Sequence, residues 1–374
     1  MVLISGLQSP RFCAVRDAFA ANFAEAGELG ARFTAVIEGE VVLDLIGGFA
    51  DAAQTVPFGP ETLTPVYSTT KAVTAVMTAR LVDRGLVTYD TPVAQVWPEF
   101  GQAGKAAVTL AQLLSHQAGL PGFSAPADPS IWFDPPAVLA RLAAQPPMWP
   151  PGTASGYHPI TGGYILGELH RRLDGRTLGA ALREDFAEPF GLDLWIGLPD
   201  AEHGRVAQMK KPPGAPDLGV IDAVKRAAFL DRGSAPGGRG SAEWRRMEIP
   251  SANGHATAPA LARLLNILAS DGVLDGERTL SSATVADAAR ERIRGADKVL
   301  PFDISWAAGL MRNEGLNIYG PNPDALGHAG WGGSCVFADP ARKLSAAYVM
   351  NRQSVHLMGD PRAVRLIEAL YASL

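Results

Sequence analysis

The chain has 374 residues, of which 47% are hydrophobic and 19% charged, a composition typical of one large globular domain or two closely joined ones. Its 33 basic and 38 acidic side chains leave a formal net charge of −5, which argues against nucleic acid or an anionic membrane as the main partner. No apolar run approaches the ~18 residues of a membrane span, and the N-terminus lacks the pattern of a secretory signal, so we expect a cytoplasmic protein.

The N-terminal part of the chain predicts a helix followed by a β-hairpin. Residues 10–26 follow the pattern of an amphipathic helix. Residues 33–37 and 41–46 are rich in β-branched side chains and alternate in polarity, and a Glu-Gly-Glu turn at residues 38–40 joins them. We expect these two runs to pair as antiparallel strands that end at the Gly-Gly pair of residues 47–48.

The middle of the chain is predicted to be mainly helical. Residues 68–84 predict a helix, with alanine, methionine and leucine in its interior, and Gly85 is a typical stop signal. A second helix is expected to begin at Thr109, whose hydroxyl can cap it while Gln112 reaches back in a capping box, and to end near Gly119. Further helices are expected at residues 137–145 and 161–173.

Residues 199–250 are rich in glycine, proline and charge, and predict a long irregular segment with one short helix near residues 220–230. Irregular segments of this length are usually functional lids or disordered, and the sequence leaves that choice open. The following segments return to regular structure: helices at residues 258–270 and 281–294, strands at residues 305–312, 335–339 and 344–351, and a last helix at residues 361–371.

This order of elements predicts an α/β (α+β) fold. Strands at both ends of the chain, with helices between them, fit one antiparallel sheet assembled from both termini, and they do not fit the alternating order of a doubly wound parallel sheet. We therefore expect a discontinuous sheet domain of residues 1–75 and 295–374. Residues 76–294 would form an inserted, mostly helical domain that carries the irregular segment.

The cysteines and histidines do not indicate a metal or another cofactor. Cys13 and Cys335 are the only cysteines and are far apart in the sequence, which predicts two buried free thiols. The seven histidines are scattered and include no H-E-x-x-H pair. We expect no bound metal and no cofactor.

The strongest chemical signal is the pair Ser68 and Lys71, three residues apart at the expected start of a helix. Positions with this spacing share one face of a helix, so the lysine amine can reach the serine hydroxyl. The N-terminus of a helix carries about half a positive charge, and this field together with burial favours the neutral lysine, which can accept a proton. Taken alone, the pair also suits a capping serine followed by a solvated lysine.

Several segments together resemble the serine β-lactamase and penicillin-binding protein superfamily. Its first motif has a counterpart in residues 68–71, Ser-Thr-Thr-Lys, and residues 108–120 resemble the helix that follows this motif in class C β-lactamases and related esterases. The second motif has a counterpart in residues 151–159, where the family places a tyrosine, here Tyr157, that works with the lysine. The resemblance covers most of the chain and implies the β-lactamase/transpeptidase-like fold.

The third motif of the superfamily has a counterpart in residues 327–334, Gly-His-Ala-Gly-Trp-Gly-Gly-Ser, which the resemblance places on a sheet-edge strand beside the nucleophile. It lacks the lysine that helps β-lactamases bind the substrate carboxylate, and a neutral, aromatic edge suits uncharged acyl groups better. His158 and Pro159 follow Tyr157 where the family has a small residue and asparagine, so the amide that would hold a substrate amide is absent. Both departures resemble family VIII carboxylesterases.

The resemblance implies a serine hydrolase that cleaves carboxylic esters with short acyl chains through an acyl-enzyme on Ser68. Lys71 and Tyr157 would be its general base and general acid. An unperturbed tyrosine has a pKa near 10, so Lys71 and other positive groups would have to lower the pKa of Tyr157 or share its proton.

The oxyanion of the reaction would lie between the N–H of the nucleophile and one N–H of the third motif. Alignment on His328 points to the N–H of Trp331, and alignment on Trp331 points to that of Ser334. Gly332 and Gly333 belong to the same candidate substrate-binding edge. His328 and Trp331 could also be packing residues.

Other functions stay open at this point. β-Lactamases, D-amino-acid peptidases, amidases and acyltransferases share the fold, and a substrate-sensing or scaffolding relative would keep it without catalysis. A Ser-His-Asp hydrolase would carry Gly-x-Ser-x-Gly, which is absent. His116 is expected to be structural. The expected partner is a small-molecule ester, and the oligomeric state is open.

Overall fold

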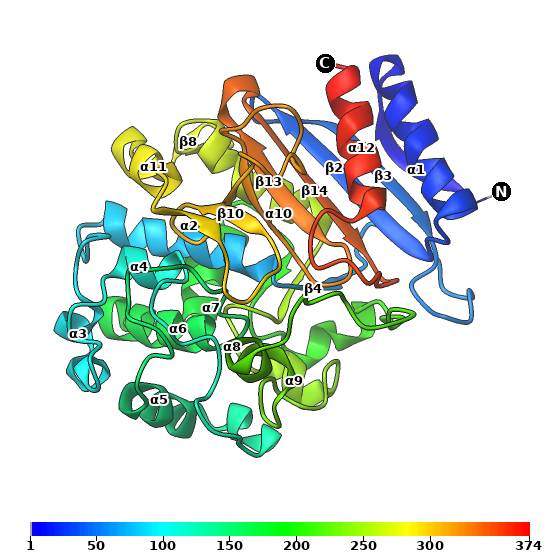
Figure 1. Ribbon diagram of the computed structural model, residues 1–374. Helices are drawn as coiled ribbons and strands as arrows, with labels where there is room; N and C mark the ends of the chain where they lie inside the picture. Colours follow the sequence, from blue (N-terminus) through cyan, green and yellow to red (C-terminus); the bar gives the residue numbers. More distant parts are fainter. Residues whose placement is uncertain (1) are drawn as a thin grey trace.

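The protein is described by a computed structural model that covers residues 2–374 (Figure 1). Nine strands form one antiparallel sheet in the order β1-β3-β2-β14-β13-β12-β11-β10-β9. Three strands come from the first 48 residues and six from the last 82, which confirms the sheet assembled from both termini. Its strands are β1 (Ile4–Gln8), β2 (Gly30–Ile37), β3 (Glu40–Gly48), β9 (Ile293–Ala296), β10 (Asp303–Trp306), β11 (Met311–Arg312), β12 (Leu326–Ala329), β13 (Cys335–Asp339) and β14 (Leu344–Met350).

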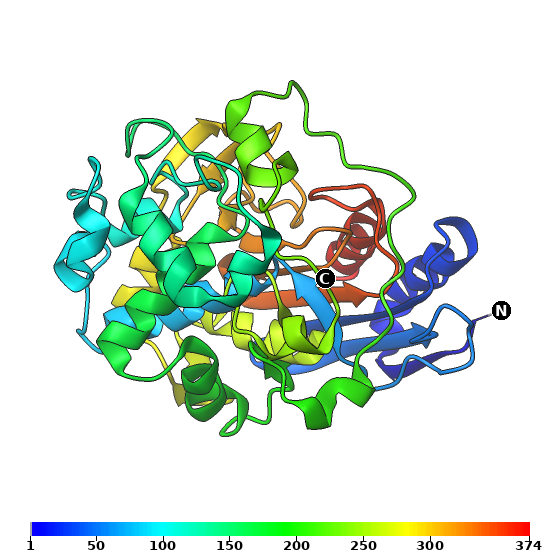
Figure 2. The ribbon, with the colours of Figure 1, turned by 90° about the horizontal axis from the view of Figure 1, so that it is seen from below.

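The two faces of this sheet carry different helices, as Figures 1 and 2 show. On one face, α1 (Cys13–Glu25) and α12 (Pro361–Ala372) lie side by side over a core that includes Phe33, Phe337 and Tyr348. On the other face, α10 (Ala258–Ala269) packs against β2, β13 and β14. The sheet therefore has an apolar core on both faces, which explains why β14 is buried along its whole length.

The helical part begins with α2 (Thr70–Asp83), which is buried from Thr70 to Ala79. Helix α2 packs between α6 (Thr161–Asp174) on one side and α10 and β12 on the other. The remaining elements of this part are α3 (Val93–Val96), η2 (Pro98–Gly101), α4 (Leu110–Leu114), η3 (Pro129–Phe133), α5 (Pro135–Ala144), α7 (Leu178–Leu182), η4 (Arg183–Ala187) and α11 (Ser282–Ala289). The boundary at residue 294 between a sheet domain and a helical domain stays a prediction.

Two smaller sheets complete the fold. β4 (Thr64–Tyr67), β6 (Gly254–Ala256) and β5 (Leu194–Trp195) form a three-stranded sheet, and β7 (Val273–Leu274) pairs with β8 (Glu277–Arg278). Two short helices flank the large sheet, η1 (Pro10–Phe12) and η7 (Pro340–Arg342). No helix within residues 2–374 has both the length and the apolar character required to cross a membrane.

Several local predictions are confirmed. β2 and β3 pair as the expected hairpin, with the backbone of Glu38 and Gly39 in the left-handed region. The capping box at α4 is present, because Thr109 accepts from the Gln112 N–H at 3.2 Å and the Gln112 side chain accepts from the Thr109 N–H at 3.0 Å. This helix ends at Leu114, however, and not near Gly119, because His116 has a left-handed φ of 62°.

Two predicted elements near the C-terminal strands are wrong in part. The helix expected at residues 281–294 ends at Ala289, and residues 293–296 form β9, which pairs with β10. The strand expected at residues 305–312 is a hairpin of β10 and β11, because Gly309 has a φ of 82° and turns the chain. Cys13 is exposed, which corrects the expectation of two buried thiols, and Cys335 is buried.

The irregular segment at residues 199–250 contains the expected short helix, formed by α8 (Ala223–Lys225) and η6 (Arg226–Leu230). It also contains η5 (Asp200–Arg205) and α9 (Ala242–Arg246), which were not predicted. Figure 2 shows the green part of this segment along the outside of the molecule. In its last helix, α9, the side chain of Trp244 is buried and lies near β4. The chain runs from β4 directly into the candidate site.

Candidate active site

Ser68 lies in the turn between β4 and α2, where it is partly exposed. The turn is closed by hydrogen bonds from the Thr69 N–H to Val66 O at 3.1 Å and from the Lys71 N–H to Ser68 O at 2.9 Å. Tyr67, directly before Ser68, has a φ of 47°, which is strained for a bulky side chain. The fold thus holds Ser68 on a sharp, fixed turn at the start of a buried helix.

The amine of Lys71 faces the hydroxyl of Ser68, with 3.4 Å between Nζ and Oγ. The same amine donates hydrogen bonds to Pro159 O at 2.8 Å and to Ser251 O at 2.9 Å. Burial holds the pKa of Lys71 well below its usual range. A neutral amine has two N–H groups and one lone pair, so the two carbonyls take its donors and the lone pair is left for the Ser68 hydroxyl.

Tyr157 completes this group. Its ring lies beneath the amine of Lys71, with 4.6 Å from Nζ to the ring centroid. Burial raises the pKa of Tyr157; the Ser68 side chain lowers it, and the charge of Asp297 raises it further. Of the two expected effects of Lys71 and other positive neighbours, a net lowering of this pKa is absent because burial is the largest effect, and sharing of the proton stays a prediction. The phenol retains its proton.

The backbone of Tyr157 is fixed by Asp297, which is distant in the sequence. Asp297 Oδ1 accepts from the Tyr157 N–H at 2.9 Å, and also from the N–H groups of Val299 at 2.9 Å and Leu300 at 3.0 Å. The ring of Tyr157 stacks on that of Trp306, with centroids 6.1 Å apart and an angle of 8° between the planes. These contacts place the second motif beside the sheet strands β9 and β10.

His158, directly after Tyr157, is fully buried. Its Nε2 accepts from the Leu120 N–H at 2.9 Å, so its proton lies on Nδ1, which is 3.3 Å from Nδ1 of His116. Burial lowers the pKa of His158 to about 3 and that of His116 well below its usual range. The two neutral imidazoles pack behind Tyr157, which agrees with a structural role for His116.

The third motif lies against the turn that carries Ser68. A Cβ on Gly330 would be 2.3 Å from Val66 O, so only glycine allows this approach. Ser334 Oγ donates to Val66 O at 2.9 Å and lies 3.1 Å from Thr69 Oγ1. The sequence-predicted residues 328–334 and 68–71 thus meet in space.

The strand that carries this motif is not a simple sheet edge. β12 pairs with β13 along its length, and Leu326 and Gly327 also pair with β11 on the other side. Only His328 and Ala329 lack a partner strand on that side. The prediction of an edge strand is therefore wrong for the first half of β12, because the hairpin of β10 and β11 adds two further strands beyond it.

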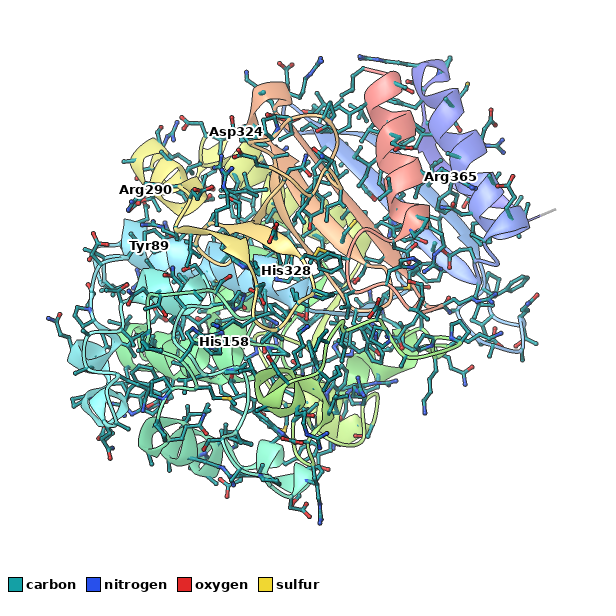
Figure 3. All side chains as sticks on the ribbon, viewed as in Figure 1. Tyr89, His158, Arg290, Asp324, His328 and Arg365 are labelled. Atoms are coloured by element: carbon teal, nitrogen blue, oxygen red, sulfur yellow. The ribbon has the colours of Figure 1, made fainter. Side chains whose placement is uncertain are left out.

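His328 is fully buried on β12, and Figure 3 shows it on the sheet side of the site, with His158 on the helical side. Its Nδ1 donates to Ala329 O at 2.8 Å, and its Nε2 has no partner among residues 2–374. Burial lowers the pKa of His328 to about 3. It is therefore a neutral acceptor, with its ring 6.0 Å from that of Tyr157.

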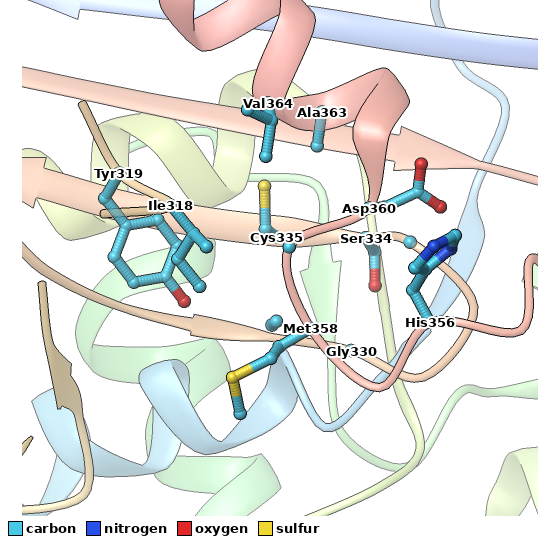
Figure 4. Close-up of a pocket in the computed structure, with 13 residues that line it drawn as sticks. Ile318, Tyr319, Gly330, Ser334, Cys335, His356, Met358, Asp360, Ala363 and Val364 are labelled. Atoms are coloured by element: carbon cyan, nitrogen blue, oxygen red, sulfur yellow. The ribbon is translucent and has the colours of Figure 1, made fainter. Parts of the chain in front are cut away.

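The turn at residues 330–334 is held from behind by the start of α12. Arg362 donates to Gly332 O at 3.1 Å and forms buried ion pairs with Glu28 at 3.0 Å and Asp360 at 2.8 Å. Figure 4 shows Asp360 beside Ser334 and Gly330 at a cavity of about 10 Å³, which is too small for more than one water molecule. A buried charge network therefore fixes the backbone of the third motif.

The aromatic side of the site is formed by the ring of Trp331. This half-buried ring contacts that of Tyr67 edge to face, with centroids 5.9 Å apart. The N–H of Trp331 has no backbone acceptor within residues 2–374, whereas the Gly330 N–H donates to Ser334 O at 2.7 Å and the Gly333 N–H to Gly330 O at 3.1 Å. Within residues 2–374 the N–H groups of Trp331 and Ser334 thus both lack an acceptor, next to the turn that carries Ser68.

Sequence reasoning missed the groups that position Lys71 and Tyr157. The two acceptors of the Lys71 amine are backbone carbonyls of Pro159 and Ser251, and no side-chain pattern marks a carbonyl in advance. Asp297 accepts hydrogen bonds from backbone N–H groups two and three residues later, which is a recognisable Asx-turn pattern. Its hydrogen bond with Tyr157, however, spans 140 residues. These contacts depend on the long-range fold.

Known proteins match most or all of the chain. A family model described as Beta-lactamase matches residues 15–370. Esterase/beta-lactamase LipL of Mycobacterium tuberculosis is 35% identical over 362 residues, which cover 93% of this chain and 83% of LipL. The crystal structure of a penicillin-binding protein homologue from Caulobacter crescentus is 61% identical, covers 100% of both chains and has a TM-score of 0.98. That of a family VIII carboxylesterase is 42% identical, also covers 100% of both chains and has a TM-score of 0.93.

Proposed function

Because the chain belongs to the beta-lactamase family and has its fold, we propose that it is a serine carboxylesterase that cleaves short-chain acyl esters through an acyl-enzyme on Ser68. The observation that carries this proposal is the amine of Lys71, held 3.4 Å from Ser68 Oγ by two carbonyl acceptors at a buried position. The names of LipL and of the family VIII carboxylesterase support ester hydrolysis.

Acylation begins when Ser68 Oγ attacks the ester carbonyl and gives its proton to Nζ of Lys71. The carbonyl oxygen becomes an oxyanion, which we assign to the N–H groups of Ser68 and Trp331. The N–H groups of Trp331 and Ser334 both lack an acceptor among residues 2–374, so this feature does not separate them. The choice of Trp331 is supported by its ring, which contacts that of Tyr67 directly before Ser68.

Tyr157 is the general acid for the departing alcohol. Its raised pKa keeps the phenol protonated, and the effect of the Ser68 side chain on that pKa supports a place for the phenol near the reacting oxygen. The proton taken up by Lys71 then returns to the phenol; the amine lies over the Tyr157 ring, with Nζ 4.6 Å from its centroid. In deacylation, neutral Lys71 accepts a proton from the attacking water and passes it to Oγ of Ser68, so that the carboxylic acid is released and both groups return to their starting states.

The preference for esters over amides is supported by what surrounds Tyr157. Pro159 stands where the resemblance places the asparagine, so no side-chain amide is offered to a substrate amide, and His158 is fully buried. His328, at the position of the third-motif lysine, is neutral. An ester also has a better leaving group than an amide, and so needs less assistance from the site.

A β-lactam-reactive site is the second candidate, favoured by the names of LipL and of the Caulobacter protein. Turnover of p-nitrophenyl butyrate, penicillin G and a chromogenic cephalosporin by the wild-type protein and by Ser68→Ala separates the two. We expect rapid ester turnover that Ser68→Ala abolishes, and slow β-lactam turnover. A cephalosporin hydrolysed as fast as the ester would reverse the ranking.

A further inference from the structure

A cation lies over the third motif, although the motif itself contains none. The guanidinium of Arg239 is 4.8 Å from the centroid of the Trp331 ring. Arg239 belongs to the irregular segment at residues 199–250, about 90 residues before the third motif, and its side chain is exposed. A guanidinium stacked on an aromatic face keeps its N–H groups free at the edge, where they can donate to a planar anion.

Arg239 has no acidic partner within residues 2–374, unlike Arg232 and Arg246 of the same segment. Arg232 pairs with Asp128, and Arg246 pairs with Asp200 at 2.6 Å. Among residues 2–374 no carboxylate lies within 4.0 Å of Arg239. An exposed arginine without an acidic partner has its donors available for a ligand.

The position of Arg239 is set by contacts of the chain that follows it. Gly238 and Gly240, with φ values of 63° and 85°, form a tight turn, and the Ser241 N–H donates to Gly238 O at 2.8 Å. Ser241 then caps α9 by accepting from the Trp244 N–H at 3.1 Å.

Helix α9 is itself anchored beside the nucleophile. Trp244 is buried, and its ring lies 6.4 Å from that of Tyr67 and 5.6 Å from that of His255. The charge of Arg239 lowers the pKa of the Tyr67 phenol, against the larger effect of burial, which raises it. Arg239 is thus close enough to act electrostatically on the residue that precedes Ser68.

We propose that Arg239 binds a carboxylate carried by the ester substrate, so that the preferred substrates are anionic esters. This inference rests on the proposed esterase function. The planar fork of arginine matches a carboxylate in two parallel hydrogen bonds, and the ring of Trp331 holds the fork in place. The irregular segment at residues 199–250 would thus supply the cation that the third motif lacks.

Matched pairs of esters test this inference on the intact protein. For a carboxylate on the alcohol side, the pair is p-butyryloxybenzoate and p-butyryloxybenzamide. For a carboxylate on the acyl side, it is mono-p-nitrophenyl adipate and p-nitrophenyl hexanoate. In each pair the ratio of kcat/KM for the charged over the neutral ester is measured for the wild type, Arg239→Gln, Arg239→Lys and the control Arg232→Gln.

We expect the wild type to prefer the charged ester of one pair, which identifies the side that carries the carboxylate. Arg239→Gln should lower that ratio about tenfold, since charge-assisted hydrogen bonds are strong and partial exposure weakens them. Arg239→Lys should restore part of it, Arg232→Gln should leave it unchanged, and about 0.5 M salt should reduce it.

The inference is overturned if the wild type turns over the neutral esters but prefers neither charged ester. It is equally overturned if the ratio for Arg239→Gln equals that of the wild type. A wild type that cleaves no ester of either pair would instead contradict the proposed esterase function, so the two failures are distinguishable.

Discussion

The Nζ atom of Lys71 lies 3.4 Å from the Oγ atom of Ser68, and two backbone carbonyls occupy the remaining donors of the amine. This relationship links the fold to the chemistry, because burial lowers the pKa of Lys71 and leaves a basic lone pair beside the hydroxyl that must be deprotonated. A solvated lysine would stay charged at neutral pH and could not accept that proton.

The pH dependence of turnover should follow this amine. Since the pKa of Lys71 is lowered, the active neutral form predominates above that lowered value, so kcat/KM should rise with pH and reach a plateau well below pH 10. Assays of p-nitrophenyl butyrate from about pH 5 to 10 measure this. Lys71→Arg, which cannot lose its proton, should abolish turnover; a rise that begins only near pH 10 would contradict a neutral lysine.

Tyr157→Phe removes the phenol and keeps the buried ring. We expect kcat to fall by about 100-fold or more, the usual contribution of a general acid, with little change in the unfolding midpoint in urea. The stacking on Trp306 and the backbone bond to Asp297 are both retained in this variant. A near-normal rate would remove Tyr157 from the mechanism.

Asp297 is predicted to act as a positioning residue. Asp297→Ala leaves the N–H groups of Tyr157, Val299 and Leu300 without their acceptor, which should cost about 2–3 kcal/mol of stability and lower kcat with little effect on KM. Asp297→Asn retains one carbonyl oxygen and should recover much of the lost stability and much of the lost kcat. Urea unfolding and steady-state kinetics compare the two variants. An Ala variant with normal kcat would show that the bond to Tyr157 does not support catalysis.

The buried network of Arg362 should make stability depend on pH. Arg362→Met leaves Glu28 and Asp360 without their partner and should cost about 3–5 kcal/mol. Burial raises the pKa of Glu28, so the folded variant binds a proton there more readily than the unfolded chain does. Its stability should therefore increase as the pH falls from about 8 to 5. Denaturant unfolding at several pH values measures this, and a loss independent of pH would contradict the role of Glu28.

Much of the fold could be predicted from local patterns. The hairpin of β2 and β3, the capping box at Thr109 and the i, i+3 spacing of Ser68 and Lys71 each depend on neighbouring residues, and each is present in the structure. Local patterns failed where a backbone dihedral decides the outcome. The left-handed conformation of His116 ends α4, and the turn at Gly309 divides the strand expected at residues 305–312.

The environment of the site could not be predicted in the same way. The carbonyl of Ser251 reaches Lys71 over 180 residues, and Arg239 reaches Trp331 from a segment with no regular pattern. Tyr157 is a further example, because burial decides the direction in which its pKa is shifted, and no motif encodes burial. Residue types therefore indicated the reaction, while its energetics depend on tertiary packing.

The most direct test is to trap the covalent intermediate. The protein is mixed with p-nitrophenyl butyrate, quenched in acid within the first turnover and measured by intact mass and peptide mapping. We predict one added butyryl group, located on Ser68 and absent from Ser68→Ala. Turnover of the ester with no adduct at any time point, or an adduct on another residue that persists in Ser68→Ala, would contradict the mechanism.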